Sequence, residues 1–280
     1  AMLLPRATPS ADAAAEHAVV IGGSIAGLLA AHVLAERVAR VTVVDRDELP
    51  LLPQSPARLP HGRHLHHLLS HGRATLERLF PGFADDMRAA GAHSIDIVAD
   101  VAWLGPGGWA PRAPSGLLTF LCGRDLIETV IRRRVAANPR VTLLERHACA
   151  GLLAHGGRVT GVQLQPRGGG APTELRADLV VDASGRTSRA PDWLEALGYG
   201  RPAERSVSAF LGYASRLYAL PEGDPGWKVL LIQSRPPHNP RTGTMTIQEH
   251  GRWIVTLAGA ARDYPPTDEA GFLAFARSLH

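Results

Sequence analysis

Two glycines, a serine and an acid near the N-terminus have the types and spacing of a dinucleotide-binding site. Gly22 and Gly27 follow the apolar run from His17 to Ile21, with Ser24 at the position between them where a further glycine is usual. The first glycine lets the chain turn sharply out of a strand, and the last lets the next helix pack close to that strand. The helix N-terminus then faces an anionic pyrophosphate. The middle position needs only a small residue, and the Ser24 hydroxyl is able to donate to a phosphate oxygen.

A second apolar run, VARVTVVDRDE, ends in Asp45, 23 positions after Gly22. An acid at this point is placed to meet the ribose hydroxyls of an adenosine, and it would repel a 2′-phosphate. The order of strand, glycine turn, helix, strand and acid within one unit therefore predicts a site for FAD or NAD rather than NADP. The alternative is an ordinary βαβ unit without a ligand.

The elements that must position these residues follow an alternating α/β plan that becomes strand-rich near its end. A helix is expected over Leu28–Glu36, a Pro- and Arg-rich loop over 51–63, and a further helix from about His64 to Phe80. A helix over Leu126–Val135 precedes three short strands, VTLLER, RVTGVQLQ and ADLVVD, and the first two are expected to join across HGG. After Pro191 the pattern predicts an antiparallel sheet in a second domain. Its strands are expected over Ser206–Tyr218, Lys228–Gln233, Thr244–Glu249 and Trp253–Ala258, before a final helix starting at the Thr267 cap.

Composition fits a catalytic chain with a sizeable core. The 280 residues are 45% apolar, which suits two domains or one large α/β unit. The formal net charge is +4, but the basic residues are dispersed, so nucleic-acid binding is not expected. Two cysteines, Cys122 and Cys149, make no disulfide framework or zinc pattern. No run reaches membrane-spanning length, residues 1–16 read as a disordered leader, and a cytoplasmic location is expected.

Four histidines raise the hypothesis of a metal site. On a helix, His61, His64, His67 and His71 would lie within a stripe about 120° wide. No cysteine or carboxylate shares that stripe, and the adjacent Arg63 would repel a cation. The sequence therefore predicts no metal site.

Several segments together resemble one family. VVIGGSIAGLLAAHVL, VTVVDRDELP, LPHGRHLHHLL, GRDLIETVIRR and LVVDASGRTSRAPDWLEALGY are similar to FAD-dependent monooxygenases of the para-hydroxybenzoate hydroxylase and squalene epoxidase type. The closest resemblance is to bacterial epoxidases of natural products, including polyether polyenes. It implies a Rossmann-like FAD-binding domain of the glutathione-reductase-like ββα type over 17–200, with an embedded substrate-domain segment at about 95–120. An antiparallel substrate domain over 201–280 would be incomplete.

The resemblance also implies roles for particular residues. Gly22, Ser24 and Gly27 would line the pyrophosphate, and Asp45 would hold the adenosine ribose. Arg124 would approach the phosphate and ribityl region, and His64 would lie beside the flavin. Backbone around Ala150 would border the adenine, and Asp182 to Gly185 would close over the pyrophosphate. The full expected FAD-binding set is Gly22, Ser24, Ile25, Ala26, Gly27, Asp45, Arg46, His64, Arg124, Ala150, Asp182, Ala183 and Gly185.

The implied activity is insertion of one oxygen atom from O₂ into an apolar natural-product intermediate, by epoxidation or hydroxylation, through a flavin C4a-hydroperoxide. The resemblance assigns no catalytic side chain, because the cofactor itself performs the difficult chemical step. Electrons would come from NAD(P)H directly or through a separate flavin reductase. The alternatives are an FAD-dependent reductase or dehydrogenase of the geranylgeranyl reductase type and a non-catalytic nucleotide-binding subunit. Since the family's third cofactor motif has no match here, a second polypeptide or a missing C-terminal segment is expected to complete the fold.

Overall fold

The computed structural model describes residues 15–53, 60–220 and 222–279, so most of the expected leader lies outside the described residues. The chain divides into two compact units, each built from separated segments. Unit 1 comprises 1–51 and 131–203, and unit 2 comprises 52–130 and 204–280. Residues 52–94 and 121–130, expected within the FAD-binding domain, are therefore grouped with unit 2.

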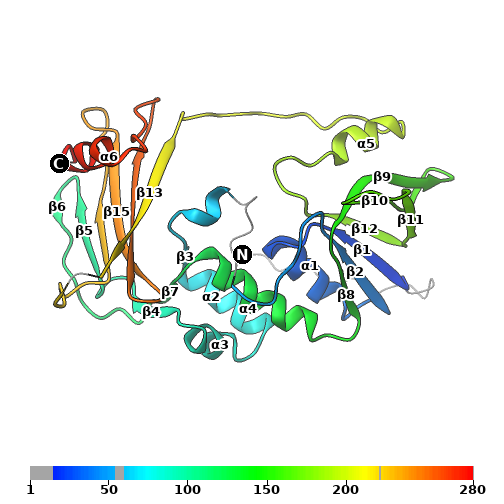
Figure 1. Ribbon diagram of the computed structural model, residues 1–280, viewed down its shortest axis with the longest axis horizontal. Helices are drawn as coiled ribbons and strands as arrows, with labels where there is room; N and C mark the ends of the chain where they lie inside the picture. The colour runs from blue at the N-terminus through cyan, green and yellow to red at the C-terminus, as the bar shows by residue number, and fades with distance from the viewer. Residues whose placement is uncertain (1–14, 54–59, 221, 280) are drawn as a thin grey trace, which may run out of the picture. The chain divides into compact units, whose positions relative to one another are not determined.

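Unit 1 is built on a four-stranded parallel sheet in the order β12-β1-β2-β8 (Figure 1). Every residue of β1 (His17–Ile21) is buried, as expected for a central strand covered on both faces. The helix α1 (Ile25–Leu34) connects β1 to β2 (Arg40–Val44), and the parallel pairing of these two strands makes a βαβ unit. The outer strands are β12 (Leu179–Asp182) and β8 (Val141–Leu144). This confirms the predicted Rossmann-like α/β region.

A three-stranded antiparallel sheet completes the core of unit 1. It has the order β11-β10-β9, from β9 (His147–His155), β10 (Arg158–Pro166) and β11 (Thr173–Arg176). Val162 and Leu164 of β10 pack against Val19 and Val44 of the parallel sheet. The short helix α5 (Ala190–Ala196) follows β12, and Trp193 packs onto the same core. The two sheets thus bury one shared apolar layer.

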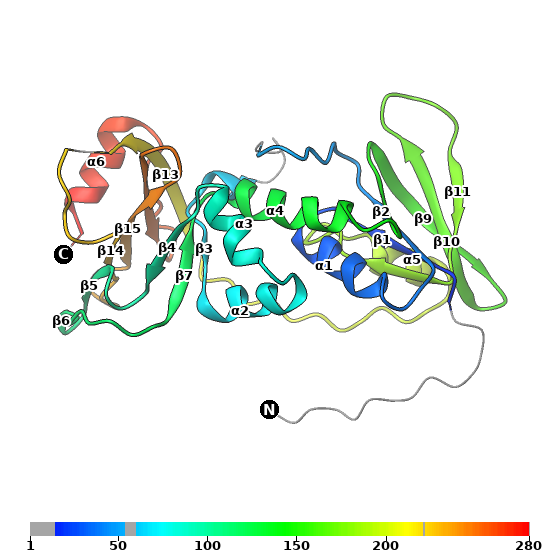
Figure 2. The same ribbon diagram turned by 90° about the horizontal axis from the view of Figure 1, so that it is seen from below.

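Unit 2 contains a six-stranded sheet in the order β13-β16-β15-β14-β5-β6. Its strands are β5 (Val101–Gly105), β6 (Gly108–Trp109), β13 (Gly212–Ala219), β14 (Val229–Ile232), β15 (Arg241–Gln248) and β16 (Arg252–Gly259). β5 pairs parallel to β14, although the two strands are far apart in the chain. The helix α6 (Glu269–Arg277) packs Phe272 and Phe275 onto Ala214 and Leu257 of this sheet (Figure 2).

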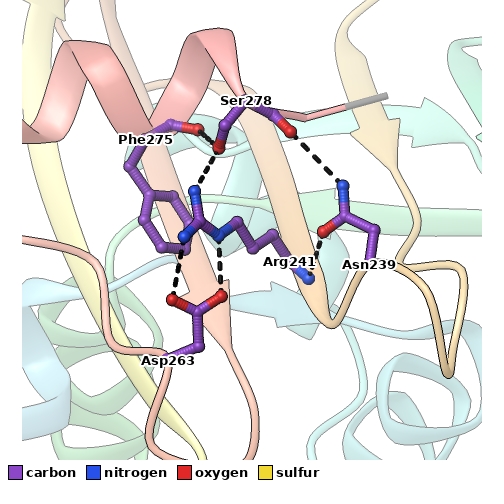
Figure 3. A network of polar contacts seen from close by, with 5 residues as sticks. All are labelled: Asn239, Arg241, Asp263, Phe275 and Ser278. Carbon is purple, nitrogen blue, oxygen red and sulfur yellow. Dashed lines mark hydrogen bonds and ion pairs between the residues drawn. The ribbon is translucent and has the colours of Figure 1, made fainter.

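Arg241, the first residue of the interior strand β15, links the end of α6 to this sheet (Figure 3). Its Nε and Nη2 donate to the two carboxylate oxygens of Asp263 at 2.7 and 2.9 Å, and Nη1 donates to Ser278 Oγ at 2.6 Å. The guanidinium also lies 4.3 Å from the centre of the Phe275 ring. Asn239 accepts a hydrogen bond from the Arg241 backbone and donates to the Ser278 carbonyl. The bidentate pair fixes the end of α6 by geometry as well as by charge.

The rest of unit 2 is a small sheet with helices. The order β3-β7-β4 is made by β3 (His67–Leu68), β7 (Leu118–Leu121) and β4 (His93–Asp96). The helices are α2 (Ser70–Leu79), α3 (Phe83–Ala89), the 3-10 helix η1 (Pro60–Arg63) and α4 (Arg124–Ala136), which runs across the boundary between the units.

The prediction of a helix from His64 to Phe80 is wrong for residues 64–69. β3 forms there instead, because His67 and Leu68 pair with Leu121 and Phe120 of β7, and α2 begins only at Ser70. The four histidines therefore come from η1, the segment after it, β3 and α2, and they do not form one helical stripe. No group of three or more metal-binding side chains occurs within residues 15–53, 60–220 and 222–279.

Other boundaries also differ from the expected ones. The strand β9 was not predicted, and the hairpin across HGG joins β9 to β10, whereas VTLLER contributes β8 and pairs with β2. The helix α1 begins at Ile25 instead of Leu28, and β13 begins at Gly212 instead of Ser206. The last helix is capped by Asp268 instead of Thr267, because the Asp268 side chain accepts a hydrogen bond from the Gly271 backbone. Across the described parts of the chain, no helix is both long and apolar enough to cross a membrane.

Candidate functional site

The candidate site lies at one edge of the parallel sheet of unit 1. Ile21, Val44 and Asp182 are paired in register across β1, β2 and β12. The residues that follow these strands, Gly22, Asp45 and Ala183, therefore emerge side by side at the carboxyl ends of the strands. Open parallel sheets bind ligands in this place.

The two glycines occupy positions that exclude a side chain. Gly22 has φ +105°, and a Cβ on it would lie 2.5 Å from the carbonyl oxygen of Ala183. A Cβ on Gly27 would lie 1.8 Å from the carbonyl oxygen of Gly22. The close approach of the helix to the turn therefore depends on both glycines. The predicted reasons for these two residues agree with this geometry.

The first backbone amides of α1 lie at the same edge. Ser24 is the N-cap, with extended backbone at ψ −176°, and Ile25 and Ala26 are the first helical residues. The first N–H groups of a helix lack partners within the helix, and its N-terminal end carries a partial positive charge. This end of α1 is therefore suited to a phosphate group.

Asp45 supports the glycine turn directly. Its Oδ2 accepts a hydrogen bond from the Gly23 backbone at 2.6 Å, and its Oδ1 accepts one from the Asp47 backbone at 2.8 Å. Each carboxylate oxygen has a second lone pair, so the group is still able to accept from a ribose hydroxyl. Arg46 is exposed, and its Nε lies 3.9 Å from Asp47.

Two further residues shape this edge, and sequence reasoning missed both. Leu49 is buried, and its methyl groups would lie 2.7 and 2.8 Å from a Cβ on Gly23. The Leu49 backbone donates to Glu145 Oε1 at 2.8 Å, and Glu145 follows β8 directly. Neither residue belongs to a recognisable motif, since their contacts come from the pairing of β2 with β8.

The loop after β12 lies against the glycine turn from the other side. Asp182 accepts hydrogen bonds from the Ser184 backbone and hydroxyl and from the Ser188 hydroxyl. Burial disfavours the charged form of Asp182, but these hydrogen bonds outweigh it and hold the pKa of that carboxyl below its ordinary value. Gly185 has φ +87°, which favours glycine. Ala150 is exposed on β9.

The remaining two predicted site residues belong to unit 2. Arg124 opens α4, and its Nε lies 3.4 Å from Glu128 Oε2, with only 19% of the arginine side chain exposed. It is therefore a mostly buried, paired group and not a solvated one. His64 donates or accepts at Nδ1 with Ser215 Oγ at 2.8 Å and packs edge-on against Tyr213. The roles of Arg124 and His64 toward a cofactor stay predictions.

The residues of unit 1 fit a dinucleotide. The turn leaves no room for side chains, a helix N-terminus suits the pyrophosphate, and an acid stands at the end of the second strand. A side chain at Gly22 or Gly27 would collide with the backbone of the turn and displace the helix N-terminus from this edge.

Comparison with known proteins agrees with this geometry. The family model for FAD-dependent oxidoreductases matches residues 18–188. Protein Rv3254 of Mycobacterium tuberculosis is 38% identical over 261 residues, covering 90% of this chain and 55% of the relative. The 6-methylpretetramide 4-monooxygenase of Streptomyces rimosus is 34% identical over 192 residues, covering 64% of this chain and 41% of the relative. The chain thus spans about half the length of these curated relatives.

A solved structure shows the same fold. The protein pqsL of Pseudomonas aeruginosa, described as a probable FAD-dependent monooxygenase, matches with a TM-score of 0.65 at 14% identity. The match covers 93% of this chain and 70% of that one. The dinucleotide expected at the glycine turn is therefore FAD instead of NAD. From the site and the matched family model together, this chain belongs to the FAD-dependent oxidoreductases.

Proposed function

We propose that the protein is an FAD-dependent monooxygenase that adds one oxygen atom of O₂ to an apolar natural-product intermediate, by epoxidation or hydroxylation. The observation that carries the proposal is the constellation of Gly22, Gly27, Asp45 and Ala183 at one sheet edge. The 34% sequence identity with the 6-methylpretetramide 4-monooxygenase supports the choice of a monooxygenase reaction. Cytoplasmic location and the polyether polyene epoxidase type belong to the same proposal.

In this proposal, FAD supplies redox chemistry and activation of O₂ when bound, with electrons from NAD(P)H or a separate flavin reductase. The protein residues bind and orient it. The amides at the start of α1 hold the pyrophosphate, and Ser24 donates its hydroxyl to a phosphate oxygen. Asp45 accepts from the adenosine ribose while it fixes the Gly23 amide. Arg124 adds a positive charge toward the phosphates, with Glu128 holding its guanidinium.

The remainder of the cofactor site is proposed to come from residues outside this chain, on the same polypeptide or on a second one. The relatives are longer than the part that matches this chain, which supports this proposal. Native mass spectrometry of the purified protein, followed by denaturing mass spectrometry, tests it. A species that matches residues 1–280 alone, holds FAD stoichiometrically and turns over would exclude any additional segment.

An isotope experiment tests the reaction. A gene deletion is expected to accumulate an intermediate that lacks one oxygen atom of the final metabolite. That intermediate, incubated with the FAD-loaded protein, NADPH, a flavin reductase and ¹⁸O₂, should give a product with one ¹⁸O atom. Asp45→Ala is the control and should lose product as FAD is lost.

Other outcomes would select the alternatives. A product changed by two hydrogen atoms without ¹⁸O would identify a reductase or dehydrogenase. Consumption of O₂ without a labelled product would contradict oxygen insertion. Tight FAD binding without any turnover, under conditions in which the full-length protein is intact, would identify a nucleotide-binding subunit.

A further inference from the structure

The helix α4 begins after a residue that has no side chain. Gly123 directly precedes α4, and its carbonyl accepts a hydrogen bond from the Ile127 backbone at 3.5 Å, which makes Gly123 the N-cap. A glycine N-cap offers no side-chain acceptor to the first amides of the helix. In a capping box, a glutamate or glutamine at the third helical position reaches back to the N-cap amide, but Leu126 occupies that position. The sequence of α4 therefore supplies no capping box.

Glu249 provides an acceptor from a different part of the chain. Its Oε2 accepts a hydrogen bond from the Gly123 backbone at 3.0 Å. A Cβ on Gly123 would lie only 2.8 Å from Glu249 Oε1, and the φ of Gly123 is not positive. The glycine is therefore required for space, since a larger residue would push the carboxylate away from the start of the helix.

The turn that carries Glu249 is attached to the strand that leads into α4. Gln248, the last residue of β15, is buried, and its carbonyl accepts a hydrogen bond from His93 Nε2 at 3.1 Å. His93 of β4 is paired in register with Leu121 of β7, shortly before Gly123. β4 therefore contacts the ends of both β15 and β7, which keeps Glu249 beside the Gly123 amide.

Arg124 is the first residue of α4 and follows Gly123 directly. Its side chain is mostly buried, and its Nε lies 3.4 Å from Glu128 Oε2, one helical turn further along. The Gly123 carbonyl and the Arg124 amide belong to one planar peptide unit, so a displacement of Gly123 also displaces the Arg124 backbone. Glu128 thus orients the guanidinium, and Glu249 fixes the backbone from which the side chain extends.

We infer that Glu249 is a positioning residue for FAD: by accepting a hydrogen bond from the Gly123 amide, it fixes the first turn of α4 and the direction in which Arg124 reaches the phosphates. This inference rests on the proposed function, since it deepens the role proposed there for Arg124. The turn between β15 and β16 thereby takes part in FAD binding through α4.

The charge of Glu249 acts in the opposite direction to its hydrogen bond. A carboxylate repels phosphates through space, so its charge alone would weaken FAD binding, and removal of that charge would strengthen it. Loss of the positioning contact would weaken FAD binding, because Arg124 would no longer be held in one direction. The sign of the change in FAD affinity therefore separates the two effects.

Fluorescence titration of the apoprotein with FAD tests the inference. We expect Glu249→Ala to raise the Kd for FAD about tenfold, and Glu249→Gln, which keeps an oxygen acceptor for the Gly123 amide, to raise it less than about threefold. Glu222→Ala removes an exposed glutamate of unit 2, and as the matched control it should leave the Kd unchanged. Each Kd is measured below the onset of thermal unfolding, so a variant that has only lost stability keeps its affinity.

A double-mutant cycle shows whether Glu249 acts through Arg124. In the Arg124→Ala background, Glu249→Ala should cause no further loss of FAD affinity, because its effect needs the guanidinium. Gly123→Ala tests the same contact where Glu249→Ala does not fold. Its Cβ would displace the carboxylate and should also weaken FAD binding, but it should have no further effect in the Glu249→Ala background.

Four results would overturn the inference. They are unchanged or tighter FAD binding in Glu249→Ala, unchanged FAD binding in Gly123→Ala, unchanged FAD binding in Arg124→Ala, and losses from Glu249→Ala and Arg124→Ala that simply add. These equilibria need neither O₂ nor turnover. A protein that shows the coupling but incorporates no ¹⁸O would refute only the proposed reaction, whereas ¹⁸O incorporation without the coupling would refute only this inference.

Discussion

Gly27 shows how strongly single residues constrain this site, because a Cβ there would lie 1.8 Å from the Gly22 carbonyl oxygen. Gly27→Ala must therefore push α1 away from the turn, at a cost of about 1–3 kcal/mol of unfolding free energy. We expect loss of FAD and a lower urea midpoint for unit 1. Gly200→Ala, also in unit 1, is the matched control, because a Cβ there would have no described atom within 4 Å. Equal effects of the two substitutions would contradict the close-packing role of Gly27.

Asp45 joins a structural and a binding role in one carboxylate. Asp45→Ala removes the acceptor of the Gly23 amide and the expected partner of the ribose, and each lost hydrogen bond costs about 0.5–1.5 kcal/mol. FAD affinity should fall tenfold or more. Asp45→Asn keeps one carbonyl acceptor and should lose less. Fluorescence titration of the apoprotein with FAD measures both, and an unchanged affinity in Asp45→Ala would remove this residue from the site.

At the scale of elements, the buried His67 of β3 makes the folded state less stable as the pH falls. Burial lowers the pKa of His67 to about 4, and its Nε2 lies 2.6 Å from Thr119 Oγ1 on β7. The unfolded chain takes up this proton near pH 6.5, so the folded state loses stability from there down to about pH 4. The slope for one group is about 1.4 kcal/mol per pH unit.

Thermal unfolding at pH 7, 6 and 5 measures this effect. His67→Gln should unfold with a shallower dependence on pH than the unsubstituted protein, although it loses some stability at pH 7. Burial also lowers the pKa of His17, His64 and His66, so part of the dependence should persist. A slope identical to that of the unsubstituted protein would contradict the burial of a neutral His67.

Elements marked by a local motif or by clear periodicity were predictable, and elements whose conformation depends on which strand they pair with were not. β1, the glycine turn, α1, β2 and Asp45 follow one another, and their periodicity and motif were sufficient to place them. β3 was missed because its pairing with the distant β7 decides its conformation. A strand of only two residues leaves no pattern of its own in the sequence, so the helical periodicity around β3 decided the prediction. β9 was missed although its partner β10 follows directly, because the hairpin across HGG was expected to start from VTLLER, which instead forms β8 and pairs with β2.

The same distinction holds for the site. Gly22 and Gly27 were predictable from a local motif, and the structure supplies the steric reason for each. Leu49 and Glu145 were not, because their contact joins segments that follow two different strands. The burial of Arg132 was not predictable either, since it is 3% exposed and its Nη1 donates at 2.7 Å to the carbonyl of Pro50, which is distant in the chain.

For the whole molecule, the segment between α5 and β13 is the most exposed stretch of the described chain. Residues 195–211 are all exposed, and Val207 is 99% exposed. Arg201 is paired with Asp192 and Glu195, whereas Arg205 lies in backbone without regular structure. We expect trypsin to cut first after Arg205.

The two products should remain together after this cut. β5 lies in the N-terminal product and β14 in the C-terminal one, and the two strands pair inside one sheet. Size-exclusion chromatography of the cut protein should therefore show one species, which separates only in denaturant. Two separate peaks under native conditions would show that the sheet does not hold the products together.

The parallel pairing of β5 with β14 also sets an order of events during synthesis. A ribosome releases the strand that ends at Gly105 well before the strand that begins at Val229, and at about 5–20 residues per second the interval is on the order of 10 s. During that time β5 has no partner on the side that later joins β14, while all four described strands of the parallel sheet have already been synthesised once Asp182 is made. The nucleotide-binding sheet is therefore able to form first, and the nascent sheet of unit 2 is the part that needs protection from other chains.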